Sequence, residues 1–146
     1  MNIRMIGFDL DGTLLTTEKV LTERTKTALK KAADQGSVLV PATWRPLCGL
    51  PKELLELPFI KYAVTANGAR ILETKTEQVL SEMLISVEKA HEILDIFSDY
   101  DTLRDVYYDG IGYSEKEKLA YIQDYVMTKA MGEYILNTRV PVESVE

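Results

Sequence analysis

Three short apolar runs alternate with helical segments before residue 66, and this alternation constrains the fold more than any other feature. A helix is predicted from Glu23 to Gln35, because Thr22 can cap its start and Gly36 can end it. A weaker helical stretch ends near Leu57. Strands separated by helices form βαβ units, so we predict an α/β fold with a parallel sheet whose first strand is central and buried on both faces. The runs are Ile3 to Phe8, Ser37 to Pro41 and Ile60 to Thr65.

After Gly68 the pattern is no longer alternating. The stretches Ala69 to Leu72 and Gln78 to Leu80 predict a hairpin around the polar turn between them. A helix is predicted from Ser86 to about Tyr100. This change predicts a first domain over residues 1–82 and a second domain over residues 83–146. The apolar face of the helix is Val87, Ala90, Ile93, Leu94 and Phe97.

The second domain is predicted to be α+β. Leu103 to Tyr113 is typical of a hairpin that turns at Asp109-Gly110. Ser114 to Glu117 has the pattern of a capping box, so we expect it to open a helix. One more strand is expected before Pro141, within the segment Tyr134 to Glu146. The helix opened by the capping box carries Leu119, Ile122 and Val126.

Charge and cysteine content exclude several classes of protein. Lys and Arg number 17 against 23 Asp and Glu, and the net charge of -6 repels polyanions, so we expect no nucleic-acid or membrane partner. Charge interrupts every apolar stretch and no secretory signal pattern is present, which predicts a cytoplasmic location. Cys48 is the single cysteine, so an internal disulfide is excluded and a buried or half-buried thiol is expected.

Two carboxylates, Asp9 and Asp11, directly follow the first apolar run. Side chains two positions apart in an extended segment lie on one side, so both acids can face one site while Leu10 enters the core. Ligands of open α/β sheets bind beyond the carboxyl ends of the strands. Paired carboxylates favour a hard cation, and Mg²⁺ commonly binds one or two of them together with a substrate phosphate. Gly12 then lets the backbone turn close to a ligand.

Three segments of the chain resemble the haloacid dehalogenase superfamily, specifically its Cof-type sugar-phosphatase-like branch. The first, Asp9-Leu-Asp-Gly-Thr-Leu-Leu15, is highly specific, whereas the other two are short. The resemblance covers about residues 3 to 73 in detail. It implies a partial Rossmann-like core, followed by an α+β segment in the position of the branch's cap domain. The other two segments are Val38-Leu-Val-Pro-Ala-Thr43 with Arg45-Pro46, and Asn67-Gly68-Ala69.

The resemblance also implies a function and roles for individual residues. It implies Mg²⁺-dependent hydrolysis of a phosphomonoester, either a sugar phosphate or another small phosphorylated metabolite. Asp9 is then the nucleophile that forms an aspartyl-phosphate, and Asp11 is the general acid and base. Both residues are expected to ligate Mg²⁺. The phosphate is expected to be bound by Gly12, Thr43, Arg45 and Asn67.

The chain departs from the family pattern in two places. Trp44 stands where the family has a glycine close to the phosphate. The family's later lysine-bearing helix and Asp-rich loop have no equivalent after Tyr113, so we expect a chain that stops in or just after its cap, with a weakened metal site. The family's later strands lie beside the first one. Without them, Ile3 to Phe8 is expected to be an exposed apolar edge through which the chain self-associates.

Other functions stay open at this point. The lacking motifs favour an inactive remnant that binds metal or phosphate or serves in an assembly, whereas the intact Asp9, Asp11 and Thr43 favour an enzyme. The Asp-x-Asp metal site of a glycosyltransferase is a weaker alternative, because no nucleotide-binding region precedes the motif. An EF-hand calcium loop is excluded, because Leu14 and Val20 occupy its glycine and glutamate positions.

Overall fold

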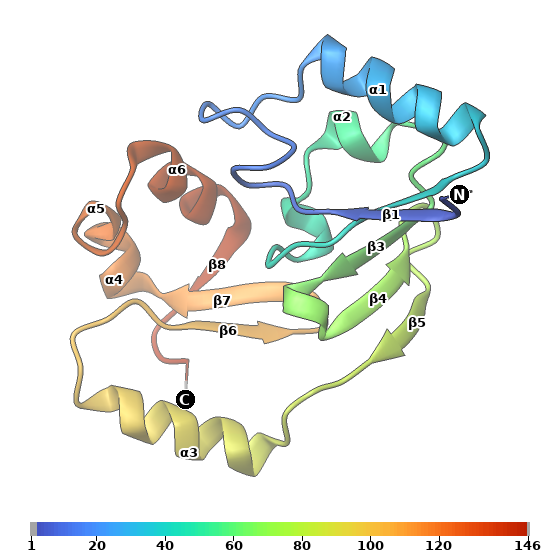
Figure 1. Cartoon of the computed structure of the whole chain (residues 1–146). Coiled ribbons are helices and arrows are strands. Elements are labelled where there is room, and N and C mark those ends of the chain that lie inside the picture. The colour runs from blue at the N-terminus through green and yellow to red at the C-terminus, as the bar shows by residue number, and fades with distance from the viewer. Residues whose placement is uncertain (1–2, 146) are drawn as a thin grey trace. The chain divides into compact units, whose positions relative to one another are not determined.

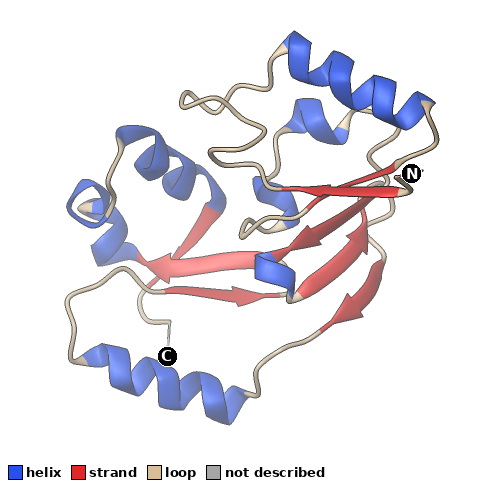
Figure 2. Cartoon of the chain, in the orientation of Figure 1, coloured by secondary structure: helices blue, strands red, loops and turns tan. Residues whose placement is uncertain are grey.

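Residues 3–145 are described in a computed structural model, in which helices and strands group into an N-terminal unit, Met1–Met83, and a C-terminal unit, Leu84–Glu146 (Figure 1). Helices occur together with parallel and antiparallel strands in the described chain (Figure 2). The predicted α/β class is therefore confirmed. Within residues 3–145, no helix is both long enough and apolar enough to cross a bilayer.

The N-terminal unit alternates strands and helices as far as its third strand and then adds two antiparallel strands. This order agrees with the βαβ pattern expected from the apolar runs. Its elements in chain order are β1 (Met5–Phe8), α1 (Glu23–Asp34), β2 (Val38–Pro41), the 3₁₀ turn η1 (Leu47–Gly49), α2 (Lys52–Leu55), β3 (Tyr62–Thr65), the 3₁₀ turn η2 (Ala66–Gly68), β4 (Arg70–Glu73) and β5 (Val79–Glu82).

Parallel pairing aligns the first three strands. β1 pairs with β2 in parallel, with Met5 opposite Val38. A parallel bridge between Ala42 and Val64 continues this order from β2 to β3. β4 and β5 extend the sheet beyond β3 in antiparallel fashion. The carboxyl ends of β1, β2 and β3 consequently lie at one edge of the sheet, where ligands of such folds bind.

Helix α1 has the ends that the sequence predicts. The Thr22 hydroxyl accepts a hydrogen bond from the backbone N–H of Thr25 at 3.2 Å, which caps the first turn. Gly36 has a φ of +86°, a left-handed conformation that glycine adopts without steric cost. The helix itself ends at Asp34, one residue before the predicted end, and Gln35 is its C-cap.

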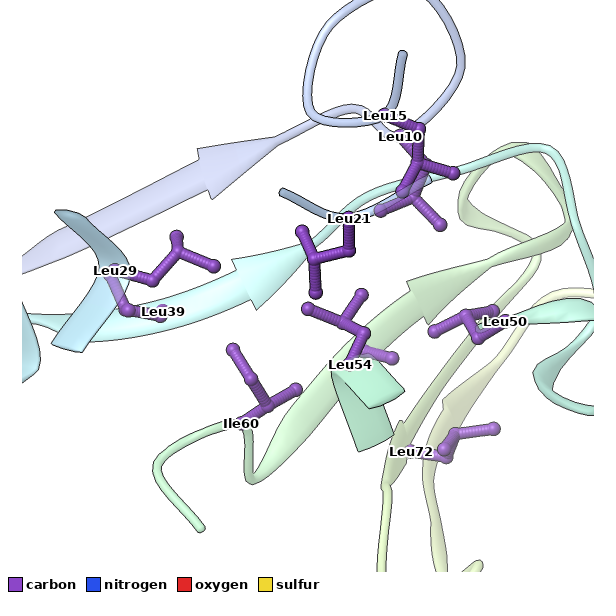
Figure 3. Close-up of a cluster of buried hydrophobic side chains, with 10 residues drawn as sticks. Leu10, Leu15, Leu21, Leu29, Leu39, Leu50, Leu54, Ile60 and Leu72 are labelled. Carbon is purple, nitrogen blue, oxygen red and sulfur yellow. The ribbon is translucent and has the colours of Figure 1, made fainter. Parts of the chain in front are cut away.

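Leucine side chains from several elements of the N-terminal unit form one core (Figure 3). Figure 3 shows Leu21 directed toward Leu54 and Ile60, although it is far from both in the sequence. Full burial of such side chains contributes about 1.5–3 kcal/mol each, so this cluster is the main source of stability of the unit. Its buried members are Leu10, Leu15, Leu21, Leu29, Leu39, Leu50, Leu54, Ile60, Ala63 and Leu72.

Two predictions for this unit are wrong. β1 is not a central strand but an edge strand, which agrees with the exposed apolar edge expected from the family comparison: β2 is its one partner among the described strands, and Met5 is 65% exposed. An apolar run without alternation suggested burial on both faces. Such burial requires other elements that pack over both faces of the strand. Cys48, expected to be buried or half-buried, is exposed. It lies in η1, where the neighbouring Leu47 is the side chain that packs against the core.

The C-terminal unit contains a second sheet, in which antiparallel β6 and β7 pair and β8 joins β7 in parallel. The hairpin turning at Asp109-Gly110 is confirmed, with φ values of +48° and +78° at the two turn residues. The elements of this unit in chain order are α3 (Val87–Ser98), β6 (Asp105–Tyr108), β7 (Ile111–Glu115), α4 (Lys116–Ala120), α5 (Ile122–Tyr125), α6 (Lys129–Thr138) and β8 (Arg139–Val142).

The predicted capping box at Ser114 is wrong. Ser114 lies inside β7, fully buried, where its hydroxyl donates to Asp105 and its backbone stands opposite Pro141 of β8. The bond across the strand pair replaces the local cap, and α4 begins at Lys116 without a side-chain cap. The predicted single helix breaks at Tyr121 into α4 and α5.

Other parts of the C-terminal unit differ less from prediction. Helix α3 begins after Ser86 as expected, but Leu94 is the one buried member of its predicted apolar face. Periodicity marks a face of a helix without saying whether another element covers it. Helix α6 was not predicted. β8 is the expected last strand, and it runs through Pro141 rather than ending before it; an edge strand tolerates proline because it lacks one neighbour.

Candidate functional site

Three predicted site residues meet at the carboxyl ends of the parallel strands. Asp9 directly follows β1, Thr43 lies two residues beyond β2, and Asn67 lies in η2 directly after β3. A pocket of about 300 Å³ opens at this edge of the sheet. The parallel register therefore brings together side chains that are far apart in the sequence. The pocket is lined by Asp9, Ala42, Thr43, Trp44, Val64, Asn67 and Gly68.

The chain reverses sharply after Asp9. The carbonyl oxygen of Leu10 accepts backbone hydrogen bonds from Leu14 at 3.1 Å and Leu15 at 2.9 Å. Gly12 supports this turn with a φ of +77°, and it lies on the surface outside the pocket lining. Leu10 is fully buried, as predicted, so it anchors the acidic loop to the core of the N-terminal unit.

Thr43 is held firmly at the pocket. It is 4% exposed, and its backbone N–H donates to the carbonyl of Val64 at 2.9 Å, while its own carbonyl accepts from the N–H of Asn67 at 3.1 Å. Its hydroxyl oxygen accepts from the backbone N–H of Arg45 at 3.2 Å. A hydroxyl used as acceptor still has its proton to donate. Thr43 can therefore donate a hydrogen bond to an anionic oxygen in the pocket.

The Asp11 carboxylate is surrounded by donors. The Lys19 ammonium donates to Oδ1 at 2.8 Å. The Arg45 guanidinium donates from Nη2 to Oδ1 at 2.6 Å and from Nε to Oδ2 at 2.8 Å. The indole Nε1–H of Trp44 donates to Oδ2 at 3.1 Å. These four bonds direct Asp11 toward protein groups, and it is not among the residues that line the pocket.

The donors change the acidity of Asp11. Partial burial by itself would raise the pKa of this carboxyl, because it disfavours the charged form. The hydrogen bonds and charges of Arg45 and Lys19 outweigh burial and lower the pKa to about 2. In the arrangement described, Asp11 is therefore an anion at neutral pH.

Arg45 lies against Asp11 rather than in the pocket. It is 5% exposed, and its third nitrogen, Nη1, donates to the carbonyl of Gly49 at 2.9 Å. These contacts use the guanidinium to link the loop after β1 to the segment after β2. Contact of Arg45 or Gly12 with phosphate stays a prediction.

Sequence reasoning missed one contributor to the site and only partly described another. Lys19 lies in the loop after the acidic motif with a φ of +63°, and no local pattern indicates that it returns to Asp11. Trp44 was noted as a departure from the family pattern, but its bond to Asp11 depends on the position of the indole in three dimensions.

The residues present fit a hard cation such as Mg²⁺ in part. Asp9 is exposed at the pocket, and within residues 3–145 no protein group bonds to its carboxylate. A free carboxylate beside an open pocket suits a cation that keeps several waters. No cluster of three or more His, Cys, Asp or Glu side chains with metal-binding geometry occurs in the described part of the chain.

The fold and the pocket define an α/β protein whose site lies beyond the carboxyl ends of a Rossmann-like parallel sheet. A family model for haloacid dehalogenase-like hydrolases matches residues 6–142. The chain belongs to this family.

Individual relatives agree with this assignment. A putative phosphatase from Bacillus subtilis, YxeH, is 32% identical over 102 residues, which are 68% of this chain and 38% of the relative. The HMP-PP phosphatase of Klebsiella pneumoniae is 31% identical over 107 residues, which are 73% of this chain and 39% of the relative. A haloacid dehalogenase-like hydrolase from B. subtilis has the same fold, with a TM-score of 0.77 and 20% identity over 98% of this chain and 55% of that structure. The chain thus spans well under two thirds of the length of these relatives.

Proposed function

We propose that the protein hydrolyses a small phosphomonoester in a Mg²⁺-dependent reaction. One observation carries the proposal: Asp9, Thr43 and Asn67 share a pocket at the carboxyl ends of three parallel strands. An unpaired carboxylate opposite a hydroxyl donor is the combination that a nucleophile and a phosphate-binding group require. Family membership supports the same chemistry.

The proposed reaction has two steps. An Asp9 carboxylate oxygen attacks phosphorus, and the bond from phosphorus to the ester oxygen breaks. The leaving alkoxide takes a proton from Asp11, which has to take up that proton from solvent beforehand because the free protein holds it as an anion. Water then attacks the phosphorus of the aspartyl-phosphate and gives a proton to Asp11, which releases orthophosphate and restores Asp9. Thr43 donates to a phosphoryl oxygen as negative charge develops there.

We propose that Asp9 holds Mg²⁺ through its carboxylate, with Asp11 contributing its backbone carbonyl oxygen from the same loop. The cation would neutralise charge between the carboxylate and the phosphoryl group when bound. The chain's own part is to present Asp9 without a competing protein partner and to keep Asp11 bound to Arg45 and Lys19.

The substrate class follows from relatives only as a proposal. A relative bears the name HMP-PP phosphatase, and another is a putative phosphatase. We propose a small phosphorylated metabolite as the substrate class, which the first of these names supports. We also propose that residues 83–146 are a cap that selects the leaving group, and that the protein is cytoplasmic and self-associates through the open edge of β1.

A second function is favoured by one observation. Asp11 is bonded by four protein donors and lies outside the pocket lining, which suits a subunit that binds phosphate or metal without turning it over. In that case Thr43 would donate to a bound phosphate or Asp9 would hold a cation, and no leaving group would receive a proton.

The deciding experiment compares hydrolysis of an aryl phosphate by the wild-type chain and by Asp9→Asn, with and without Mg²⁺. Glu18→Gln is the matched control, because Glu18 is an exposed acid in the loop that follows the motif. The enzyme hypothesis expects hydrolysis that requires Mg²⁺, is lost in Asp9→Asn and is unchanged in Glu18→Gln. The same slow background in all three proteins would favour the binding subunit.

A further inference from the structure

Trp44 is shared by the pocket lining and by the partners of Asp11. It lines the pocket together with Asp9 and Thr43. Its indole N–H also donates to Asp11 Oδ2. Because Asp11 does not line the pocket itself, Trp44 is the residue that joins the pocket to the carboxylate that has to exchange protons with a substrate.

The Asp11 carboxylate has no spare acceptor position in this arrangement. Two carboxylate oxygens offer about four lone-pair positions. Lys19 and Arg45 occupy both positions on Oδ1, and Arg45 and Trp44 occupy both on Oδ2. A substrate oxygen can therefore reach Asp11 only if one of these donors leaves.

The indole is the donor that can leave most easily. Arg45 is buried and is also bonded to the carbonyl of Gly49, so its guanidinium is held from two sides. Lys19 and Arg45 are cations, so an ion-pair attraction to the Asp11 carboxylate adds to each of their hydrogen bonds. The bond from Trp44 comes from a donor without charge and is the longest of the four, and Trp44 borders the pocket that a ligand would fill.

We propose that Trp44 is a gating residue: its indole N–H closes Asp11 Oδ2 in the free protein, and a phosphate group entering the pocket displaces it and opens Asp11 to the leaving-group oxygen. The inference rests on the proposed function, because it takes Asp9 and Thr43 as the phosphate site. Trp44 acts through Asp11, so it is a positioning residue and not a catalytic one.

The first test uses the protein's own fluorescence, since Trp44 is its single tryptophan. The full chain is titrated with inorganic phosphate, with and without Mg²⁺, while calorimetry follows binding in parallel. When the indole N–H leaves Asp11, its hydrogen-bond partner changes from a carboxylate to water. We therefore expect a saturable change in emission over the phosphate concentrations at which calorimetry records binding. Binding by calorimetry with unchanged emission would overturn the gate.

A reporter variant controls for general effects of the anion on fluorescence. The double variant Trp44→Phe, Tyr62→Trp moves the single tryptophan to the first residue of β3, at the end of that strand away from the pocket. Its emission should not respond to phosphate. A response equal to that of the wild type would show that the signal does not report on Trp44, and would overturn the inference.

Kinetics of Trp44→Phe supply the second test, because phenylalanine keeps a ring in the pocket wall and removes the N–H. In the wild type the entering phosphate has to break the bond from Trp44 to Asp11, and Trp44→Phe removes this cost, so KM for an aryl phosphate should fall about tenfold, the factor that corresponds to ~1.4 kcal/mol. kcat should change much less, because Asp11 is already open in the substrate complex of both proteins. A fall in kcat would mean that the indole supports Asp11 rather than closing it.

The two proposals fail differently. An emission change with phosphate but no hydrolysis of any phosphomonoester would retain the gate as an anion response and overturn the proposed enzyme. If hydrolysis depends on Asp9 but Trp44 emission does not respond to phosphate, the proposed enzyme is retained and the gate is overturned. If the protein neither binds phosphate nor hydrolyses a phosphomonoester, both proposals are overturned.

Discussion

Arg45 binds both carboxylate oxygens of Asp11, at 2.6 Å from Nη2 to Oδ1 and 2.8 Å from Nε to Oδ2, across 34 positions of sequence. Two parallel bonds fix the orientation of a carboxylate more strictly than a single bond does. This ion pair joins the loop after β1 to the segment after β2. It is consequently a contact on which both the stability of the N-terminal unit and the arrangement of the site depend.

Arg45→Gln should destabilise the protein by ~3 kcal/mol, because it leaves Asp11 partly buried without its main partner. The change is measured as a lower urea midpoint at unchanged slope. Lys30→Gln is the matched control: its ion pair with Asp34 is exposed, at 2.7 Å, and its loss should cost less than ~0.5 kcal/mol. Similar losses in the two variants would show that the Asp11 pair adds no special stability.

Thr43→Val should reduce kcat for an aryl phosphate about 100-fold, because it removes one donor to the developing charge while keeping the shape of the side chain. Thr43→Ser retains the hydroxyl and should stay within a few-fold of the wild type. Steady-state kinetics with saturating Mg²⁺ separate the two. If both variants lose activity to the same extent, the methyl group rather than the hydroxyl matters at this position.

Leu10→Ala should destabilise the N-terminal unit by ~3 kcal/mol, because a fully buried leucine is replaced by a cavity. Activity should fall with it, since Leu10 anchors the loop that carries Asp9 and Asp11. Leu84→Ala removes an exposed leucine and should cost less than ~0.5 kcal/mol. Denaturant unfolding of both variants checks this expectation, and a wild-type midpoint for Leu10→Ala would contradict it.

Gly112→Ala should destabilise the C-terminal unit by ~2 kcal/mol through overpacking. A Cβ at this position would lie 2.7 Å from Cδ of Arg139, whose Nε donates to Asp105 at 2.7 Å and cannot move freely. Gly7→Ala is the matched control, because its Cβ would meet nothing closer than the carbonyl of Val40 at 4.0 Å. Thermal unfolding that ranks the control as the less stable variant would contradict this assignment.

The open edge of β1 should support self-association. Met5→Lys places a charge on this edge, and charged side chains on an edge strand discourage pairing with a second copy. Sedimentation velocity over a range of concentrations should show association in the wild type and a shift to monomer in Met5→Lys. Met127→Lys, at a fully exposed methionine of the C-terminal unit, should leave association unchanged. A wild type that sediments as a monomer at every concentration would rule out this contact.

Local signals were sufficient for most of the secondary structure. Thr22 and Gly36 mark the ends of α1 because capping depends on residues within one helical turn. Asp109-Gly110 marks the β6–β7 hairpin because both residues tolerate a positive φ. Such features need no information from distant parts of the chain, and the structure confirms them.

Predictions failed where a distant partner decides the outcome. Ser114 has the local pattern of a helix cap, but Asp105 and β8 hold it in a strand. Lys19 carries no signal at all, since its partner Asp11 is reached only through the turn of the intervening loop. The catalytic, phosphate-binding and metal-binding roles of the site residues stay predictions.

The amino-acid sequence alone determined the α/β class, the position of the acidic pair after the first strand, and the family of the protein. Periodicity, caps and a compact motif are each encoded within a few neighbouring positions. Tertiary structure decided which of these side chains share a pocket. Parallel pairing of β1, β2 and β3 brings Asp9, Thr43 and Asn67 to one edge, whereas Arg45, Lys19 and Trp44 direct Asp11 away from it. Hydrogen bonds between segments far apart in sequence exist only once the chain has folded, and they control the charge and direction of a carboxylate that the motif merely places nearby.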